Sequence, residues 1–219
     1  MQLTIKQLYQ TMYTEMGPQG WWPADSKWEI ILGAILVQNT NWRNVVPALA
    51  NLKASTNFEP AKLHALSATE LEPLIRSSGF YHNKSKAISA VFTWLATYDY
   101  DLTAIKQACG DQLRPKLLTL RGIGAETADV FLVYIFDVPT FIADSYTRRL
   151  FTHLGVPSSN YQQLYRQVQL PPDFTPAQAQ EFHGLLDEFG KLYLQTPAGW
   201  PQSFLAGAQL IIKSAYPAR

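Results

Sequence analysis

The sequence predicts an all-α protein with a sizeable apolar core. The chain has 219 residues, of which 47% are hydrophobic and 16% are charged, and this balance is typical of globular proteins. Apolar residues recur at helical spacing along most of the chain. The only segment that alternates at the period of a strand is the short 139–144, "PTFIAD". We therefore expect helices throughout, with one short strand over 139–144.

Caps and periodicity predict where the helices begin. One starts after Ser26, which stands three residues before Glu29 in the spacing of a capping box, and its apolar residues cover most faces, as in a central buried helix. Ser67 and Glu70 repeat this spacing. Further helices are predicted over 83–98, 112–120, 144–155 and 175–195, and the apolar tail 201–216 is expected to form the last one.

Charge and cysteine content narrow the class of protein. The net charge is +1 and the pI is about 7.8, so any nucleic-acid binding must rest on a local basic face. The single cysteine, Cys109, excludes internal disulfides and thiolate metal clusters. The N-terminus lacks the apolar stretch of a signal peptide, and no segment approaches a membrane span. We expect a cytoplasmic monomer that binds no membrane.

Two glycines one residue apart stand between two predicted helices in "LRGIGAETAD". Gly122 and Gly124 flank Ile123 and permit a tight helix-to-helix turn. The bare amides of Gly124 and Ala125 can approach a phosphate at the positive end of the next helix. A hairpin that is tight only for packing, with Ile123 as its core residue, explains the short pattern equally well.

Asp144 precedes the predicted helix "SYTRRLF" and has two compatible interpretations. It is a natural N-cap for that helix. A carboxylate at a helix N-terminus is also held ionised and oriented, which suits the stabilisation of a positive sugar fragment better than proton abstraction.

Several segments in a fixed order resemble the endonuclease III superfamily of DNA glycosylases. "LRGIGAETADVFL…PTFIADSYTRRL" is similar to the helix–hairpin–helix and following aspartate of that superfamily. "WWPADSKWEIILGAILVQNTNW", "RSSGFYHNKSKAI" and "EFHGLLDEFGK" resemble its 3-methyladenine DNA glycosylase III branch. The matching segments run from about Trp21 to Lys191 and cover most of the chain.

The resemblance implies roles for the hairpin and for the aspartate. Gly122, Ile123 and Gly124 match the hairpin that grips the DNA backbone. Asp144 matches the catalytic carboxylate, which stabilises an oxocarbenium-like sugar and helps to position the attacking water. Glu126 stands where lyase-competent members carry a Schiff-base lysine, and a carboxylate cannot form that imine. The implied enzyme is monofunctional, although Glu126 is also an ordinary first-turn acid.

Other matching residues are implied to handle the damaged base. Gln38 matches the residue that enters the duplex beside the extruded nucleotide, unless it merely ends a helix. Trp21, Trp22 and Trp42 match aromatic positions around the base pocket. Lys191 matches a lysine near that pocket, and a solvated helix lysine is an equally good explanation. Electron-rich indoles would favour a positively charged alkylated purine.

No cofactor is predicted. Endonuclease III itself carries four cysteines for an iron–sulfur cluster, whereas the corresponding segment 191–207 has none, and Leu194 stands about where the first ligand would be. No iron–sulfur cluster is therefore expected. A monovalent cation held by hairpin carbonyls is a family feature that the sequence neither supports nor excludes. His82 and His183 lack the partners of a zinc site and are interpreted as structural.

Local basic residues have to supply any phosphate contacts, because the total charge is nearly neutral. The candidates are Lys84, Lys86, Arg121 and the pair Arg148–Arg149. Charged residues on exposed helix faces are common, so only part of this set is expected to bind DNA.

The resemblance implies two all-α lobes with a DNA-binding cleft between them. Residues 28–138 would form the central lobe with the helix–hairpin–helix, and 1–27 plus 139–219 the second lobe with the catalytic aspartate. The predicted function is a monofunctional glycosylase of base excision repair that acts on double-stranded damaged DNA, with 3-methyladenine or another alkylated purine as its base. The alternatives are a glycosylase for oxidised or mismatched bases and a non-catalytic protein that binds damaged DNA.

Overall fold

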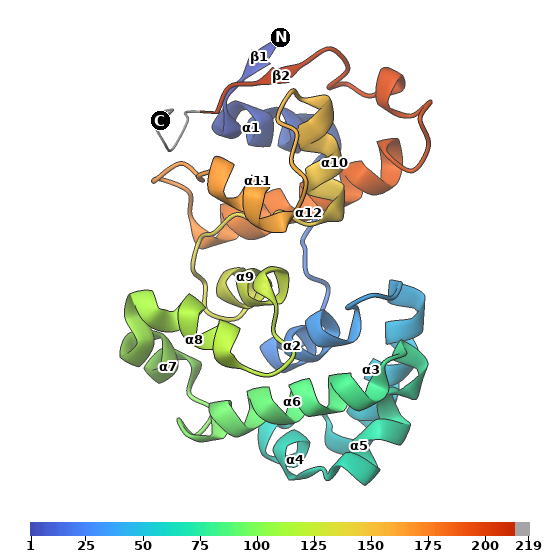
Figure 1. Cartoon of the computed structure of the whole chain (residues 1–219), viewed down its shortest axis with the longest axis vertical. Helices are drawn as coiled ribbons and strands as arrows, with labels where there is room; N and C mark the ends of the chain where they lie inside the picture. The colour runs from blue at the N-terminus through green and yellow to red at the C-terminus, as the bar shows by residue number, and fades with distance from the viewer. Residues whose placement is uncertain (213–219) are drawn as a thin grey trace. The chain divides into compact units, whose positions relative to one another are not determined.

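The computed structural model of the chain describes residues 1–212 and is helical nearly throughout (Figure 1). The prediction of an all-α protein is confirmed. The α-helices are α1 (Ile5–Met16), α2 (Lys27–Leu36), α3 (Trp42–Thr56), α4 (Pro60–Ala65), α5 (Ala68–Ile75), α6 (Tyr81–Ala96), α7 (Leu102–Cys109), α8 (Leu113–Thr119), α9 (Ala125–Tyr134), α10 (Ser145–His153), α11 (Tyr161–Gln167) and α12 (Pro176–Tyr193). The 3-10 helices are η1 (Arg76–Ser78), η2 (Gly110–Gln112) and η3 (Trp200–Gln202).

The chain divides into two units. One, which we call the central unit, is Ala24–Phe136 and holds α2 to α9. The other, the terminal unit, combines Met1–Pro23 with the chain from Asp137 onwards and holds α1 and α10 to α12. Among the described helices, none has the length and apolar composition that crossing a bilayer requires.

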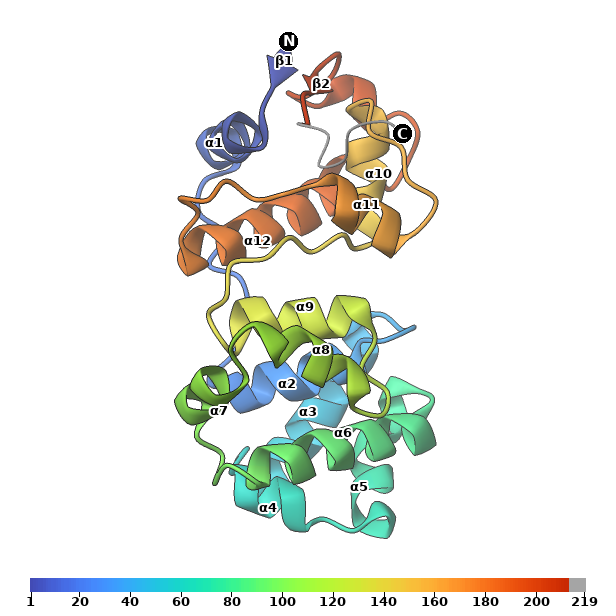
Figure 2. The same cartoon turned by 60° about the vertical axis from the view of Figure 1, so that its left-hand side comes forward.

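Helix α2 lies at the middle of the central unit. Its seven residues Ile30–Leu36 are all buried, as expected for a helix that is apolar on most faces. Ser26 caps it by accepting a hydrogen bond from the N–H of Glu29 at 3.2 Å. Because α2 packs against α3, α6 and α9, it is covered by helices on several sides (Figure 2). This packing sets the position of the loop that follows α2.

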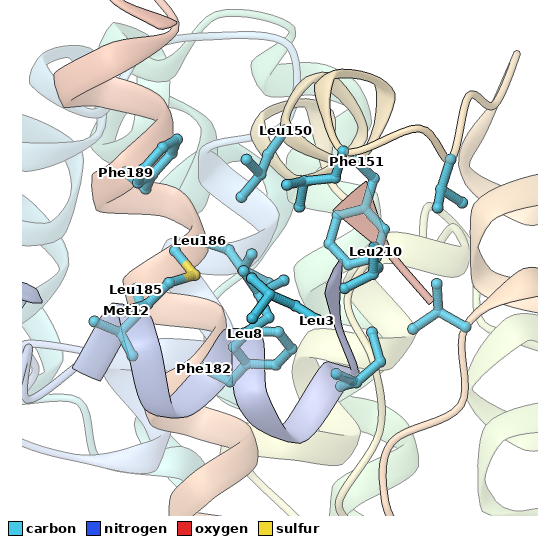
Figure 3. Packing of buried hydrophobic residues seen from close by; sticks show 14 of the residues in the cluster. Leu3, Leu8, Met12, Leu150, Phe151, Phe182, Leu185, Leu186, Phe189 and Leu210 are labelled. Atoms are coloured by element: carbon cyan, nitrogen blue, oxygen red, sulfur yellow. The ribbon is translucent and has the colours of Figure 1, made fainter. Parts of the chain in front are cut away.

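The core of the terminal unit forms around one face of α12 (Figure 3). Helices α1 and α10 both pack against α12. The buried side chains shown in Figure 3 include Leu8 and Met12 from α1, Leu150 and Phe151 from α10, and Phe182, Leu185, Leu186 and Phe189 from α12. The four α12 residues follow the i, i+3, i+4, i+7 spacing of one helical face. His183, Asp187 and Lys191 lie on a neighbouring face of α12, at i, i+4 and i+8.

Two predictions about local structure are wrong. Segment 139–144 forms no strand: Phe141, Ile142 and Ala143 are consecutively buried instead of alternating. The described part of 201–216 contains no α-helix; it has the end of η3, a turn with Gly207 at φ +75°, and a strand. That strand, β2 (Gln209–Leu210), pairs in parallel with β1 (Gln2–Leu3). Apolar composition alone therefore gave a wrong prediction of a helix, because β2 is extended and pairs with β1 at the N-terminus.

Candidate active site and nucleic-acid interface

Asp144 caps helix α10 in the terminal unit. Its backbone is extended, with φ −63° and ψ −176°, and its Oδ1 accepts a hydrogen bond from the N–H of Thr147 at 2.7 Å. The side chain is only 13% exposed. The sequence-based prediction of an N-cap is confirmed, and the same contact orients the carboxylate at the positive end of the helix.

His183 on α12 faces the other oxygen of Asp144. Its Nε2 lies 3.4 Å from Asp144 Oδ2, and the imidazole is buried. Burial raises the pKa of the Asp144 carboxyl, but His183 and the Thr147 N–H outweigh burial and hold that pKa below its ordinary value. Asp144 is therefore an anion at neutral pH. The interpretation of His183 as merely structural misses its contact with this carboxylate.

Trp21 packs closely on α12. A Cβ atom at Gly184 would lie 2.5 Å from the Cβ of Trp21, so only glycine permits this approach. The carboxylate of Glu181, one turn earlier, accepts hydrogen bonds from the N–H groups of Gln19 and Gly20, at 2.5 and 3.3 Å. The segment that carries Trp21 is thus fixed against α12. The ring of Trp22 follows, with its centroid 5.7 Å from that of Trp21.

Lys191 connects α12 to the ring of Trp21. Its Nζ lies 4.7 Å from the centre of that ring, 2.5 Å from Asp187 Oδ2 and 2.7 Å from Glu188 Oε1. Burial lowers the pKa of Lys191, but the two carboxylates outweigh burial and raise that pKa above its ordinary value. Burial also raises the pKa of Asp187. Lys191 is therefore a paired ammonium beside an indole, not a freely solvated helix lysine.

The glycine turn between α8 and α9 has the form of a tight hairpin in the central unit. Gly122 adopts φ +79°, and a Cβ there would lie 2.6 Å from the Cβ of Ala87 on α6. Gly124 is the N-cap of α9, at φ −85°, with open space around it. The side chain of Ile123 is buried, whereas both glycines are exposed. Tight packing explains Gly122 and Ile123, while Gly124 leaves the N-terminus of α9 bare.

The side chain of Gln38 contacts this hairpin. Its Nε2 donates to the carbonyl oxygen of Gly122 at 3.2 Å and to Thr127 Oγ1 at 2.9 Å. Gln38 lies just beyond the end of α2, so the loop after α2 and the hairpin are linked within one unit. Gln38 therefore does more than end α2, because its side chain also binds the hairpin.

Comparison with known proteins assigns the family. Residues 32–171 match the family described as HhH-GPD superfamily base excision DNA repair protein. A protein of Methanocaldococcus jannaschii named "Putative DNA repair glycosylase MJ1434" is 34% identical over 89% of this chain and 90% of its own length.

The chain belongs to the HhH-GPD superfamily of base excision DNA repair proteins.

Solved structures of similar fold include one enzyme bound to a modified base and one bound to DNA. H. pylori 3-methyladenine DNA glycosylase, bound to 1,N6-ethenoadenine, superposes with a TM-score of 0.72 at 26% identity and covers 89% of this chain and 100% of its own. A trapped endonuclease III–DNA covalent intermediate superposes with a TM-score of 0.69 at 19% identity, over 91% of this chain and 90% of its own. The second likeness shows the HhH-GPD fold alone.

The remaining residues proposed for base and DNA contacts in this HhH-GPD protein differ in exposure and in their contacts. Trp42 opens α3 in the central unit and is 38% exposed. Glu126 is exposed in the first turn of α9, where an acid complements the helix dipole. Lys86 and Arg121 are exposed, as a phosphate contact requires. Arg149 donates to the carbonyl oxygen of Leu194 at 3.1 Å and lies over the ring of Tyr146.

Lys84 does not fit the role of a phosphate contact. Its side chain is buried, and its Nζ donates to the carbonyl oxygens of Leu36 and Ser78 at 2.8 and 2.6 Å. Burial lowers the pKa of Lys84 to about 8. The prediction that Lys84 is a candidate phosphate contact is wrong. Helix α6 turns this side chain inwards, where it binds the ends of α2 and η1.

Sequence reasoning missed the polar residues of α12 other than Lys191. Glu181 holds the Trp21 segment, His183 faces Asp144, and Asp187 pairs with Lys191. The spacing of His183, Asp187 and Lys191 at four-residue intervals was a usable signal, since it predicts a shared helical face. A pocket of about 640 Å³ elsewhere in the terminal unit is lined by residues within 139–141 and 165–174 and includes none of the predicted site residues.

Proposed function

We propose that this protein is a monofunctional DNA glycosylase, which hydrolyses the N-glycosidic bond of a damaged nucleotide. One observation carries the proposal: a member of the HhH-GPD family holds Asp144 as an oriented anion, bound by the Thr147 N–H and facing His183. A fixed carboxylate of this kind stabilises positive charge that develops on a sugar, without a proton transfer of its own.

The proposed reaction requires only water. The bond between C1′ and the base nitrogen breaks, its electron pair leaves with the base, and the sugar becomes oxocarbenium-like. Asp144 stabilises that cation and orients the water that adds to C1′, as carboxylates do in glycoside hydrolysis. The water loses one proton to solvent, and the products are the free base and an abasic site. No cofactor takes part in these steps.

DNA is proposed to bind through the backbone of the central unit's hairpin. The exposed Gly122 and Gly124, with the amide of Ala125 at the start of α9, suit a phosphate oxygen. The target nucleotide has to leave the stack, because its glycosidic bond is inaccessible inside the duplex. Gln38 is proposed to fill the gap, for which it must give up its hydrogen bonds to Gly122 and Thr127.

The proposed base is 3-methyladenine, with 7-methylguanine as a second candidate. Trp21, Trp22, Trp42 and Lys191 are proposed as residues of its pocket. Indole rings attract a cationic alkylated purine, whose glycosidic bond is also intrinsically labile. The charge of Lys191 would oppose a cationic base, but Asp187 and Glu188 offset it. The likeness to a 3-methyladenine DNA glycosylase at 26% identity supports this choice.

The proposed enzyme lacks lyase activity. Schiff-base formation requires an unprotonated amine, and Glu126 supplies none at the position of the family's lysine. Lys191 is a poor substitute, because its pKa is raised and it is paired with two carboxylates. Borohydride added during the reaction should therefore trap no protein–DNA adduct, and the abasic strand should stay intact until alkali is added. A trapped adduct would contradict this part of the proposal.

The experiment that tests the function is identification of released bases. Purified protein is incubated with methylated duplex DNA, and separately with duplexes that carry uracil or 8-oxoguanine, and the free bases are measured by mass spectrometry. We expect 3-methyladenine from the wild type and release that is slower by about a hundredfold or more from Asp144→Asn. Release of only uracil or 8-oxoguanine would contradict the proposal that 3-methyladenine is the substrate. Binding without release of any base would identify a non-catalytic protein that binds damaged DNA.

A further inference from the structure

The two carboxylate oxygens of Asp144 have different neighbours. Oδ1 accepts a hydrogen bond from the Thr147 N–H at 2.7 Å, a contact that every good N-cap makes. Oδ2 is 3.4 Å from Nε2 of His183, which comes from a different helix far along the chain. Helix capping requires only the first of these contacts, so the second needs another explanation.

We propose that His183 is a positioning residue for Asp144, an inference that rests on the proposed catalytic role of that carboxylate. A proton on Nε2 of His183 points to Oδ2 and fixes it, while Thr147 fixes Oδ1. The carboxylate then cannot turn away from the sugar. In a buried site a hydrogen bond to an anion is strong, and an anion that lacks it is costly.

The surrounding fold restricts the imidazole of His183 to this position. The ring is buried on α12, and the adjacent Gly184 is in close contact with Trp21. Charged groups near His183 include Asp144 at the start of α10 and, one turn along α12, Asp187, which pairs with Lys191. His183 thus lies between the catalytic carboxylate and the acid that anchors the lysine beside Trp21.

Loss of the His183 contact should slow the reaction without weakening DNA binding. Without a donor, Oδ2 would be a buried oxygen with less stabilisation, so the carboxylate would be less fixed and more easily protonated. The hairpin that is proposed to hold DNA belongs to the other unit. The effect is therefore expected in the rate constant for excision and not in the dissociation constant for duplex DNA.

Two substitutions of similar polarity separate positioning from packing. The terminal amide of Gln reaches about as far as Nε2 of histidine, whereas that of Asn ends near the place of Nδ1. His183→Asn should lower the single-turnover rate by about tenfold to a hundredfold, the range for one hydrogen bond to a charged group. His183→Gln should keep most of the wild-type rate. Equal rates for wild type and His183→Asn, or equal losses in both variants, would overturn the proposal.

A double-mutant cycle with Asp144→Asn links the effect to the carboxylate. His183→Asn should cause no further loss in that background, because its effect acts through Asp144. Additive losses would show an independent, structural role. If Asp144→Asn alone keeps the wild-type rate, the proposed function fails; if it is inactive while His183→Asn is unimpaired, only the positioning role fails.

NMR on the intact wild-type protein gives a test that needs no substituted histidine. The ¹⁵N spectrum of His183 should show the proton on Nε2 at neutral pH, and the signal should shift in Asp144→Asn. A proton found only on Nδ1 would contradict the proposal, because an unprotonated Nε2 cannot donate to Asp144.

Discussion

In the central unit, the hairpin and Gln38, which are proposed to contact DNA, present neutral groups, whereas in the terminal unit the proposed catalytic site is built from charges. The hairpin offers exposed glycine backbone and the amide of Gln38. Helix α12 and the start of α10 hold Asp144, His183 and the Asp187–Lys191 pair, all partly or fully buried. Phosphate binding needs only accessible donors and close approach, but stabilising a sugar cation needs a charge removed from water.

From this difference we expect DNA binding and excision to be separable in the molecule. The hairpin and Asp144 belong to different units, each with its own core. Substitutions in the central unit should change DNA affinity, and substitutions in the terminal unit should change the excision rate. Each of the following variants tests that division.

The largest effect is expected at Asp144. Asp144→Asn keeps a capping side chain for α10 but removes the negative charge, so single-turnover excision should fall by about a hundredfold or more. Affinity for duplex DNA, measured by fluorescence anisotropy, should change little. Near-wild-type excision would contradict the proposed role of the Asp144 charge in the reaction.

The next effect is expected at the hairpin, where two glycines form a matched pair. Gly122→Ala places a Cβ at positive φ and 2.6 Å from Ala87, so it should lower the free energy of unfolding by about 1–3 kcal/mol and weaken binding to damaged and undamaged duplexes alike. Gly124→Ala, with φ −85° and open space, should leave stability unchanged. Urea unfolding and anisotropy measure both. A loss confined to damaged DNA would place the hairpin in the base pocket.

A smaller effect is expected at Trp42, which crosses the division because it belongs to the central unit but is proposed to contact the base. Trp42→Ala should lower 3-methyladenine release by about tenfold, since a cation–π contact contributes roughly 1–2 kcal/mol when desolvated. Duplex affinity should fall less than the rate. The opposite ranking would make Trp42 part of the DNA-binding surface alone.

The effect expected at Lys84 concerns stability and not excision or DNA binding. Burial lowers its pKa to about 8 in the folded protein, below the 10.5 of an ordinary lysine. Between these two values the unfolded chain binds more protons than the folded chain, so Lys84 makes the protein more stable as pH rises through this window. Relative to Lys84→Met, wild type should gain unfolding free energy between pH 8 and 10 in urea titrations. A constant difference would show that Lys84 titrates normally.

Local signals predicted what depends on a few neighbouring residues. The caps at Ser26 and Asp144, the apolar burial of α2, and the tight turn at Gly122 could all be read from spacing, because each is decided within one or two helical turns. Composition was less informative. It predicted a helix over 201–216, where β2 pairs with β1 from the opposite end of the chain.

Local propensity and motifs in a fixed order were enough to predict several of the long helices, caps such as Ser26 and Asp144, and the family to which the chain belongs. Which polar residues meet depends instead on the tertiary packing. Lys84 is buried against Leu36 and Ser78, and Lys191 lies over Trp21. His183 faces Asp144 because α12 packs on α10. Such contacts join residues far apart in the chain, and only core packing fixes the helix faces that bring them together.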